Sequence, residues 1–396
     1  MDTPQETLEK KLSDALVKCA LYRAEKTHKT VFINRSPYVN AEGLVRSFID
    51  DFDIDEYRTV LYIDYNDAFQ VFELSSADPK FSIELKESDP MGNGIFRSKY
   101  LVNGLQTVEI WDDDFYYCGI KNGSERIDKS SYGEKREALN PHGFGAFGKN
   151  LHTQFDRWKI TNIIFAANCD TPSPHIMIDS PQCLAYGHLI GYNLFVTTAA
   201  PKFILPEDMS YAFTGLPMLR SIFGLEYLDT SRVTNMKEMF SGINVDYLDL
   251  SGFDTSNVTN MERMFEDSGN FFFIDITDSQ HHVLDISGFS TGKVKTMYEM
   301  FNGTEYDYIK LGDWNFNAIE DPLYLWDSWS FHGKYDVRLM SNENLLTLIR
   351  KNDYLYSWNF LCNDAQKEWF QREEIRSQIE RELKNVTFVE KDDWYD

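Results

Sequence analysis

The chain has few cysteines and no long apolar run. Only five of its 396 residues are cysteine, and no two of them have the Cys-x-x-Cys spacing of a zinc or redox site. An odd, scattered set argues against a disulfide framework and favours reduced thiols. No stretch approaches the ~18 apolar residues of a membrane helix, and the polar residues 1–11 lack the apolar core of a signal peptide. We therefore expect a cytoplasmic protein without a membrane span.

Catalytic signatures are also missing. The sequence contains no Walker motif, no nucleophile elbow and no His-Glu-x-x-His. A Gly-x-Gly-x-x-Gly occurs at 143–148, but the polar residues before it do not form the strand that a phosphate-binding loop requires. The pair His281-His282 and the run 112–114 (Asp-Asp-Asp) read as a solvated loop and a charged turn. We expect no catalytic, cofactor-binding or metal-binding residues.

Basic residues are scarce relative to acidic ones. The chain has 39 Lys and Arg against 63 Asp and Glu, a formal net charge of −24. Residues 201–330 hold 21 of those acids and 8 of those bases, so more than half of the net charge lies there. Such a surface repels nucleic acid and anionic membranes and favours basic partners, although acidity also serves solubility alone.

The strongest positive signal is a repeat. Met209–Phe213, Met236–Phe240, Met261–Phe265 and Met297–Phe301 are versions of one phrase, and their phenylalanines are 27, 25 and 36 residues apart. The last three follow a second phrase that begins at Asp229, Asp254 and Ser290, and residues 248–253 and 284–289 share a third phrase, Leu-Asp-(Leu/Ile)-Ser-Gly-Phe. The long step contains an insertion near 271–282. A period of about 25 predicts a stacked solenoid.

Each repeat carries one apolar side. Leu248 and Leu250 alternate with Asp249, as in a short strand with one buried face. Residues 254–256 (Asp-Thr-Ser) have helix N-cap chemistry, and the Met and Phe positions follow at helical spacing. We therefore predict units of strand, turn and short helix, in which the Met-Phe stripe forms core rather than a metal or cofactor site.

These phrases resemble a known family. LDTSRVTNMKEMFSG, LDLSGFDTSNVTNMERMF and LDISGFSTGKVKTMYEMF are similar to the BspA-like leucine-rich repeats, in the Met-Phe form common in bacterial surface proteins and mycoplasma lipoproteins. The resemblance covers roughly residues 201–320. It implies a leucine-rich-repeat solenoid with a binding role and no catalytic residues. Family members are mostly secreted or surface-anchored, whereas this chain shows no signal peptide or anchor.

The remaining segments complete an α+β fold of three domains. Residues 1–150 are predicted to be an α+β domain that ends in a Gly-rich linker at 130–149. It has helices at 4–25 and 41–50 and strands near 30–34, 59–64, 69–74, 81–85, 107–111 and 115–120. Residues 151–335 form the solenoid, with further strands at 158–166, 176–178 and 193–196. Residues 336–396 form a helical cap, with helices at 345–350 and 364–384.

The function predicted from these patterns is protein binding. Alignment of the repeats places five candidate partner-binding residues on the exposed strand face: Tyr247, Asp249, Asp285, Tyr308 and Lys310. The expected partner is a protein with basic and apolar features, without direct contact to nucleic acid. The two aspartates equally fit a local turn role. Two alternatives stay open: an acidic inhibitor or nucleic-acid mimic that blocks a basic nucleic-acid-handling protein, and a cryptic enzyme in residues 1–150. The sequence leaves the partner's identity and the oligomeric state undetermined.

Overall fold

A computed structural model of the protein describes residues 4–28, 30–34, 59–66, 71–92, 95–111, 160–169, 176–177, 185–191, 193–216, 219–245, 248–269, 283–320, 325, 334–351, 358–377 and 386–389. The chain forms two compact units. One comprises residues 1–134 with the segments 189–195 and 271–279, and the other comprises the rest. Within the described ranges, no helix combines the length and apolar character needed to cross a membrane.

The first unit begins with a long helix that packs on a small sheet. Helix α1 (Pro4–Thr27) confirms the predicted helix and contacts β1 (Val31–Asn34) and β2 (Val60–Asn66). Its apolar stripe recurs every three to four residues, which places the stripe on one face. The buried members of the stripe are Leu8, Leu12, Leu16, Cys19, Ala20 and Ala24.

Two three-stranded sheets follow in the same unit. Strand β2 pairs in parallel with β1 and antiparallel with β3 (Val71–Ser76). The other sheet is an antiparallel meander of β4 (Ile83–Gly92), β5 (Ile95–Val102) and β6 (Gln106–Trp111). The sequence did not predict β5, whose Arg97 and Lys99 pair across the sheet with acids of β4. The helix expected at 41–50, the strand at 115–120 and the linker at 130–149 lie outside the described residues.

A mixed sheet forms between residues 162 and 223. Its strand order is β12-β7-β10-β9-β8, with β7 and β12 parallel and β8 and β9 antiparallel. The bounds are Asn162–Ala166 (β7), Ile176–Met177 (β8), Tyr186–Ile190 (β9), Asn193–Thr197 (β10) and Ser221–Phe223 (β12). The short strands β11 (Phe203–Ile204) and β13 (Leu228–Asp229) pair in parallel, and a 3-10 helix, Leu225–Tyr227, precedes β13.

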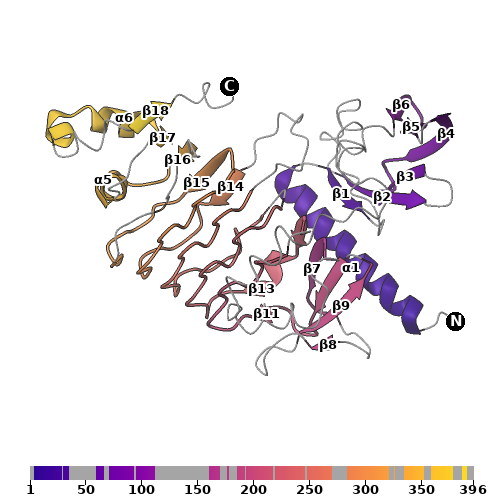
Figure 1. The fold of residues 1–396 in the computed structure, drawn as a ribbon, viewed down its shortest axis with the longest axis horizontal. Helices are drawn as coiled ribbons and strands as arrows, with labels where there is room; N and C mark the ends of the chain where they lie inside the picture. Colours follow the sequence, from indigo (N-terminus) through magenta and orange to yellow (C-terminus); the bar gives the residue numbers. More distant parts are fainter. Residues whose placement is uncertain are drawn as a thin grey trace. The chain divides into compact units, whose positions relative to one another are not determined.

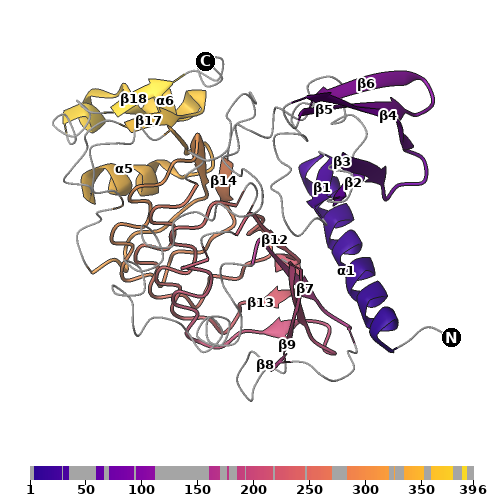
Figure 2. The same cartoon turned by 45° about the vertical axis from the view of Figure 1, so that its right-hand side comes forward.

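The repeats build a β-solenoid of about six turns with few helices. Five parallel strands lie side by side in chain order (Figures 1 and 2): β14 (Val283–Ile286), β15 (Tyr308–Leu311), β16 (Lys334–Asp336), β17 (Trp358–Leu361) and β18 (Val386–Val389). Ile286 pairs with Leu311, which lies 25 residues later, in agreement with the repeat period of about 25.

The Met-Phe phrases do not form the predicted short helices. The third residue of each phrase has a left-handed backbone, with φ of 62° at Tyr211, 51° at Glu238, 52° at Arg263 and 54° at Glu299. Backbone N–H groups here donate to the next turn instead of back along a helix: Glu238 to Glu262 and Phe240 to Met264, both at 2.9 Å. Stacking between turns satisfies these donors and overrides the helical spacing of the side chains.

The Met-Phe stripe is the core of the solenoid, as predicted. Phe213, Phe240, Phe265 and Phe301 are fully buried and stack in a column, with successive ring centroids 5.2, 5.7 and 6.0 Å apart and rings within 10° of parallel. The methionines of the phrases are at most 1% exposed. Each turn therefore completes the core of its neighbours.

The Asp-Thr-Ser phrases make turns rather than helix caps. Asp254 Oδ1 accepts a hydrogen bond from the Ser256 N–H at 2.9 Å. The buried Thr255 hydroxyl donates to the Ser290 carbonyl of the following turn and accepts from the Ser290 N–H. Thr230 makes the same exchange with Asp254 one turn earlier. These threonines fix the register of one turn on the next.

The C-terminal segment continues the sheet, so a purely helical cap at 336–396 is not confirmed. Strands β17 and β18 were not predicted. Helix α5 (Asn342–Lys351) confirms the helix expected at 345–350. Helix α6 (Asp364–Phe370) is followed by a break at 371–372 and by helical residues 373–377, so the single helix expected from 364 does not form. Both helices lie in connections between parallel strands.

Candidate functional site

The parallel strands place one row of side chains away from the core. Backbone register puts Asp285 opposite Lys310, and Lys310 opposite Asp336. Their neighbours along each strand, Leu284, Ile309 and Tyr335, are buried. Asp249 occupies the same position one turn earlier, between the buried Leu248 and Leu250. We call Asp249, Asp285, Lys310 and Asp336 the strand-face row.

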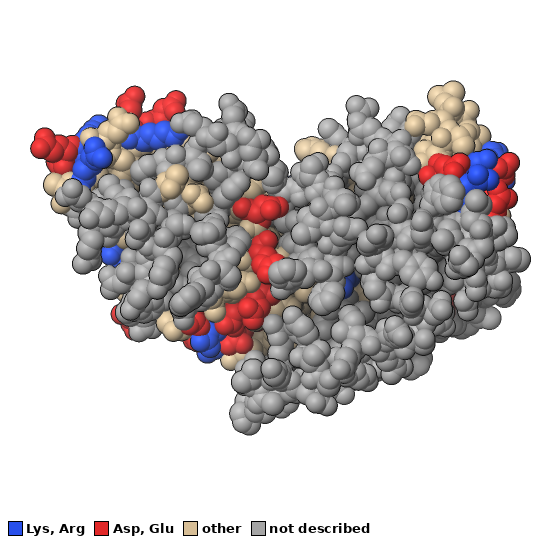
Figure 3. All heavy atoms as spheres, turned by 45° about the horizontal axis from the view of Figure 1, so that its top comes forward, with Lys and Arg blue, Asp and Glu red and all other residues tan. Residues whose placement is uncertain are grey.

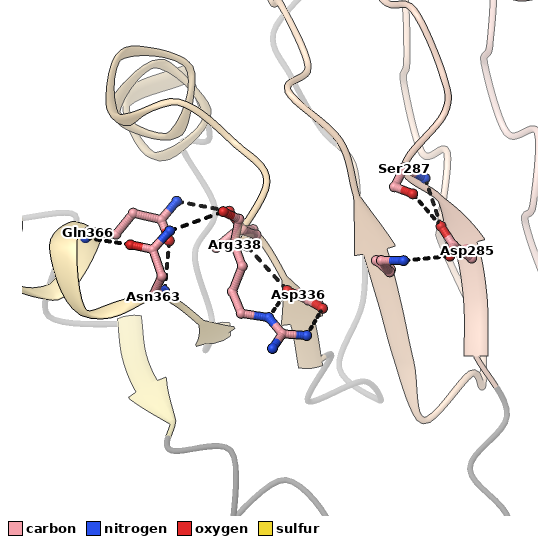
Figure 4. Close-up of polar contacts among 8 residues, drawn as sticks. Asp285, Ser287, Asp336, Arg338, Asn363 and Gln366 are labelled. Atoms are coloured by element: carbon pink, nitrogen blue, oxygen red, sulfur yellow. Dashed lines mark hydrogen bonds and ion pairs between the residues drawn. The ribbon is translucent and has the colours of Figure 1, made fainter.

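Asp285 and Lys310 form an ion pair in this row. Lys310 Nζ lies 2.8 Å from Asp285 Oδ2, and the side chains are 34% and 49% exposed respectively. Asp285 Oδ1 also accepts hydrogen bonds from the backbone N–H and the hydroxyl of Ser287, at 3.0 and 2.6 Å (Figure 4). Burial alone would raise the pKa of Asp285, but the hydrogen bonds from Lys310 and Ser287 outweigh it and lower that pKa.

Asp336 is paired within its own turn. The Arg338 guanidinium donates two hydrogen bonds to it, from Nε to Oδ1 at 2.9 Å and from Nη2 to Oδ2 at 2.7 Å (Figure 4). The Asp336 side chain is 5% exposed and that of Arg338 is 42% exposed. Because two-point guanidinium contacts hold a carboxylate firmly, this acid is neutralised where it stands.

Asp249 differs from the other acids of the row. Its Oδ1 accepts a hydrogen bond from the Ser251 N–H at 3.0 Å, which is the local turn contact proposed from the sequence. Within the ranges that the structure describes, Asp249 has no ion-pair partner. The same type of turn at Asp285 shows that both aspartates have a structural role.

The other candidates flank the row. Tyr308 is partly exposed in β15, opposite the partly exposed Val283 of β14. Tyr247 lies outside the described residues. The structure thus brings Asp285, Tyr308 and Lys310 together on two adjacent strands.

A second group of charges lies where the Met-Phe phrases turn. Arg263 pairs with the nearly buried Glu299, and its Nε lies 3.5 Å from Glu266 Oε1. Lys237 binds Glu262 at 2.8 Å. Burial raises the pKa of Glu266 to about 7, Arg263 opposes the rise, and Asp267, Glu238 and Glu299 add to it. Because the pairs Arg263–Glu299 and Lys237–Glu262 join successive turns, we assign this group to stacking of the solenoid.

The described surface contains both signs of charge. On the face drawn in Figure 3, acidic side chains gather in a short line near the middle, and basic side chains lie among acids toward the two upper edges. Groups of His, Cys, Asp and Glu that could hold a metal ion are absent from the described part of the chain.

One known family matches the part of the chain that contains the Met-Phe repeats. Residues 207–328 match the family described as "Mycoplasma protein of unknown function, DUF285". Comparisons with curated proteins and with solved structures gave no match. The matched range holds Asp249, Asp285 and Lys310, but not Asp336 and Arg338, and it overlaps the stretch that resembles the BspA-like repeats.

Asp336 and Arg338 were not predicted from the sequence. The signal that would have found them is the period, because Asp336 lies 26 residues after Lys310 and 25 residues separate Lys310 from Asp285. The repeat phrases disappear after Phe301, and residues 334–338 (Lys-Tyr-Asp-Val-Arg) do not resemble Leu-Asp-Ile-Ser. Only the spacing and the alternation survive there.

Proposed function

We propose that the protein is a non-enzymatic binding module whose strand face recognises a protein partner. The observation that carries this proposal is the arrangement of the sheet, in which one side is core and the other carries a row of charged side chains, two of them well exposed. Asp285 and Lys310 keep 49% and 34% of their side chains exposed although they lie in the middle of paired strands. A rigid, regularly spaced row of this kind is how solenoids build extended binding surfaces.

The resemblance to BspA-like repeats supports the proposal, since members of that family mostly bind proteins and host ligands. A partner with a mixed surface suits the row, which joins acids, a lysine and the aromatic Tyr308. Aromatic and charged residues together are typical of the centre and the rim of protein interfaces.

The test compares partner capture by matched variants. Tyr308→Ala combined with Asp249→Lys removes the aromatic contact and reverses one charge while leaving the core intact. Glu320→Lys is the control, because it changes the net charge as Asp249→Lys does at a site whose side chain is 66% exposed and lies off the row. Affinity purification from the native host with mass spectrometry should show a protein that the double variant loses and the control retains. Equal recovery by all forms would place the binding site elsewhere.

An acidic inhibitor or nucleic-acid mimic is the second candidate. The line of acidic side chains in Figure 3 favours it, whereas the ion pairs of the strand-face row count against it because they neutralise two of the three acids. Competition separates the two functions: duplex DNA should displace the protein from the partner of a mimic and should leave ordinary recognition unchanged. A cryptic enzyme in residues 1–150 stays a third hypothesis, and a large part of that stretch lies outside the described residues.

A further inference from the structure

Two of the three acids of the strand-face row each form an ion pair with a cation of the same chain. Lys310 binds Asp285 at 2.8 Å, and Arg338 binds Asp336 through two hydrogen bonds. Because Lys310 and Arg338 already neutralise Asp285 and Asp336, these two acids attract a basic partner less strongly than an unpaired carboxylate does. Among the residues that the structure describes, the uncompensated negative charge of the row lies at one end, at Asp249.

The Asp249 carboxylate is fixed by a hydrogen bond and points away from the core. The hydrogen bond from Ser251 N–H fixes one carboxylate oxygen, and the buried Leu248 and Leu250 on either side turn the side chain away from the core. The turn that carries Asp249 directly precedes the turn of Asp285, because Thr255 and Ser290 exchange hydrogen bonds. A preformed acid loses little rotamer freedom when a cation arrives.

The neighbouring surface is apolar and aromatic. In the adjacent row of the same face, Val283 lies opposite Tyr308, and both are partly exposed. A partner segment lying across the strands would therefore meet a carboxylate at Asp249 and then, on β14 and β15, the pair Val283 and Tyr308 beside a salt bridge that is already closed.

We propose that the strand face selects a protein segment with one lysine or arginine for Asp249, next to an apolar or aromatic residue for Val283 and Tyr308. Asp249 is then the specificity-determining residue. A second cation at Asp285 or Asp336 would have to displace Lys310 or Arg338, so a uniformly basic partner gains little there. This inference rests on the proposed binding function and adds the chemistry of the partner.

Two peptide libraries test the inference on the full-length protein. Both have random apolar and aromatic flanks; the central residue is lysine in one library and the uncharged, similarly long norleucine in the other. Wild type should retain the lysine library more strongly. Asp249→Asn should lower the affinity of the selected lysine peptides about 3- to 10-fold, the scale of one solvent-accessible ion pair or slightly more. Glu320→Gln should leave it unchanged.

The decisive variant changes affinity in the opposite direction. Lys310→Met releases Asp285, so lysine peptides should bind several-fold more tightly while norleucine peptides gain no more than the added methionine gives them. A purely structural role for the row would weaken binding in both variants. If Tyr308→Ala abolishes binding but Asp249→Asn does not change it, the choice of Asp249 is wrong and the binding face stands. If none of the strand-face variants changes binding, both proposals are wrong.

Discussion

The turns at 207–320 and those at 334–389 add strands in the same way but close the solenoid differently. In the earlier turns, which we call the Met-Phe turns, the chain returns through left-handed residues and a column of stacked phenylalanines. In the later ones, which we call the helical turns, it returns through α5 and α6. One parallel sheet, from β14 to β18, runs through both.

The difference lies in where the backbone hydrogen bonds go. Residues of a Met-Phe turn donate to the next turn, as Arg263 does to Tyr298 and Phe265 to Met300. Residues of α5 and α6 donate largely within their own helix, and Asn363 and Gln366 cap α6 reciprocally. A Met-Phe turn is therefore incomplete without its neighbours, whereas a helical turn satisfies much of its backbone locally. A destabilising substitution in a Met-Phe turn should therefore also loosen the neighbouring turns, whereas one in a helical turn should affect mainly that turn.

Truncation of a core phenylalanine should show this contrast with the largest effect. Phe265→Ala leaves a cavity in the middle of the column, between Phe240 at 5.7 Å and Phe301 at 6.0 Å. We expect a loss of about 3–5 kcal/mol in the free energy of unfolding. Urea denaturation measures this loss, and hydrogen exchange shows whether amides of the turns on both sides lose protection.

Phe370→Ala is the matched variant, since Phe370 is also buried but lies at the end of α6. Its loss of protection should be confined to α6 and the strands beside it. If both variants expose the same extent of chain, the two kinds of turn do not differ in cooperativity.

Adding a methyl group at Gly312, where two turns approach closely, should have the next largest effect on stability. A Cβ on Gly312 would overlap the Ser287 carbonyl of the preceding turn. We expect Gly312→Ala to destabilise the protein by about 1–3 kcal/mol because the two backbones must separate. Thermal unfolding measures the change. Gly288→Ala is the control, because a Cβ there meets no atom within 4 Å; a comparable loss at Gly288 would contradict the role of close approach.

The difference between Met-Phe turns and helical turns also explains which parts of the fold could be predicted from the sequence. Period and alternation were sufficient for β14, the buried Met and Phe positions and the 25-residue step from Ile286 to Leu311, but not for β5, β17 and β18. They failed for the Met-Phe phrases, because spacing of three to four residues fits a helix and a stacked turn equally well. Only the donors of Glu238 and Phe240, which pair with the next turn, decide between them.

The site was predictable to a similar degree. Alternation placed Asp249, Asp285 and Lys310 on the exposed side of the strands, and the turn role of both aspartates was foreseen as an alternative. The same 25-residue step that pairs Ile286 with Leu311 places Lys310 opposite Asp285, and the structure adds the ion pair between them. Asp336 and Arg338 were missed because the helical turns keep the period without the sequence phrase.

Removing a helix cap should have a smaller and local effect. The Asn363 side chain accepts a hydrogen bond from the Gln366 N–H at 2.9 Å and donates one to the Arg338 carbonyl at 3.1 Å. Asn363→Ala should cost about 1 kcal/mol, with protection lost mainly in α6. Asn363→Asp keeps the cap acceptor and loses the donor, so an equal cost for both variants would assign the effect to Arg338 rather than to capping. Chemical denaturation with hydrogen exchange distinguishes these results.

The smallest expected effect is a pH dependence that belongs to the Met-Phe turns. Burial raises the pKa of Glu266 from 4.5 to about 7, so the folded state holds this proton more tightly than the unfolded state. Stability from this group is therefore present at low pH and is lost as pH rises toward and through 7. Denaturation midpoints of wild type should fall between pH 5.5 and 8, and those of Glu266→Gln should fall less because glutamine stays neutral. Glu320→Gln, at an exposed acid, corrects for the rest of the chain, including its histidines.

The fall of the denaturation midpoint with pH should also steepen in Arg263→Met. The cation that opposes the pKa rise is then gone, and Asp267, Glu238 and Glu299 act on Glu266 unopposed. Identical slopes in wild type and Glu266→Gln would show that Glu266 is already ionised in the folded state.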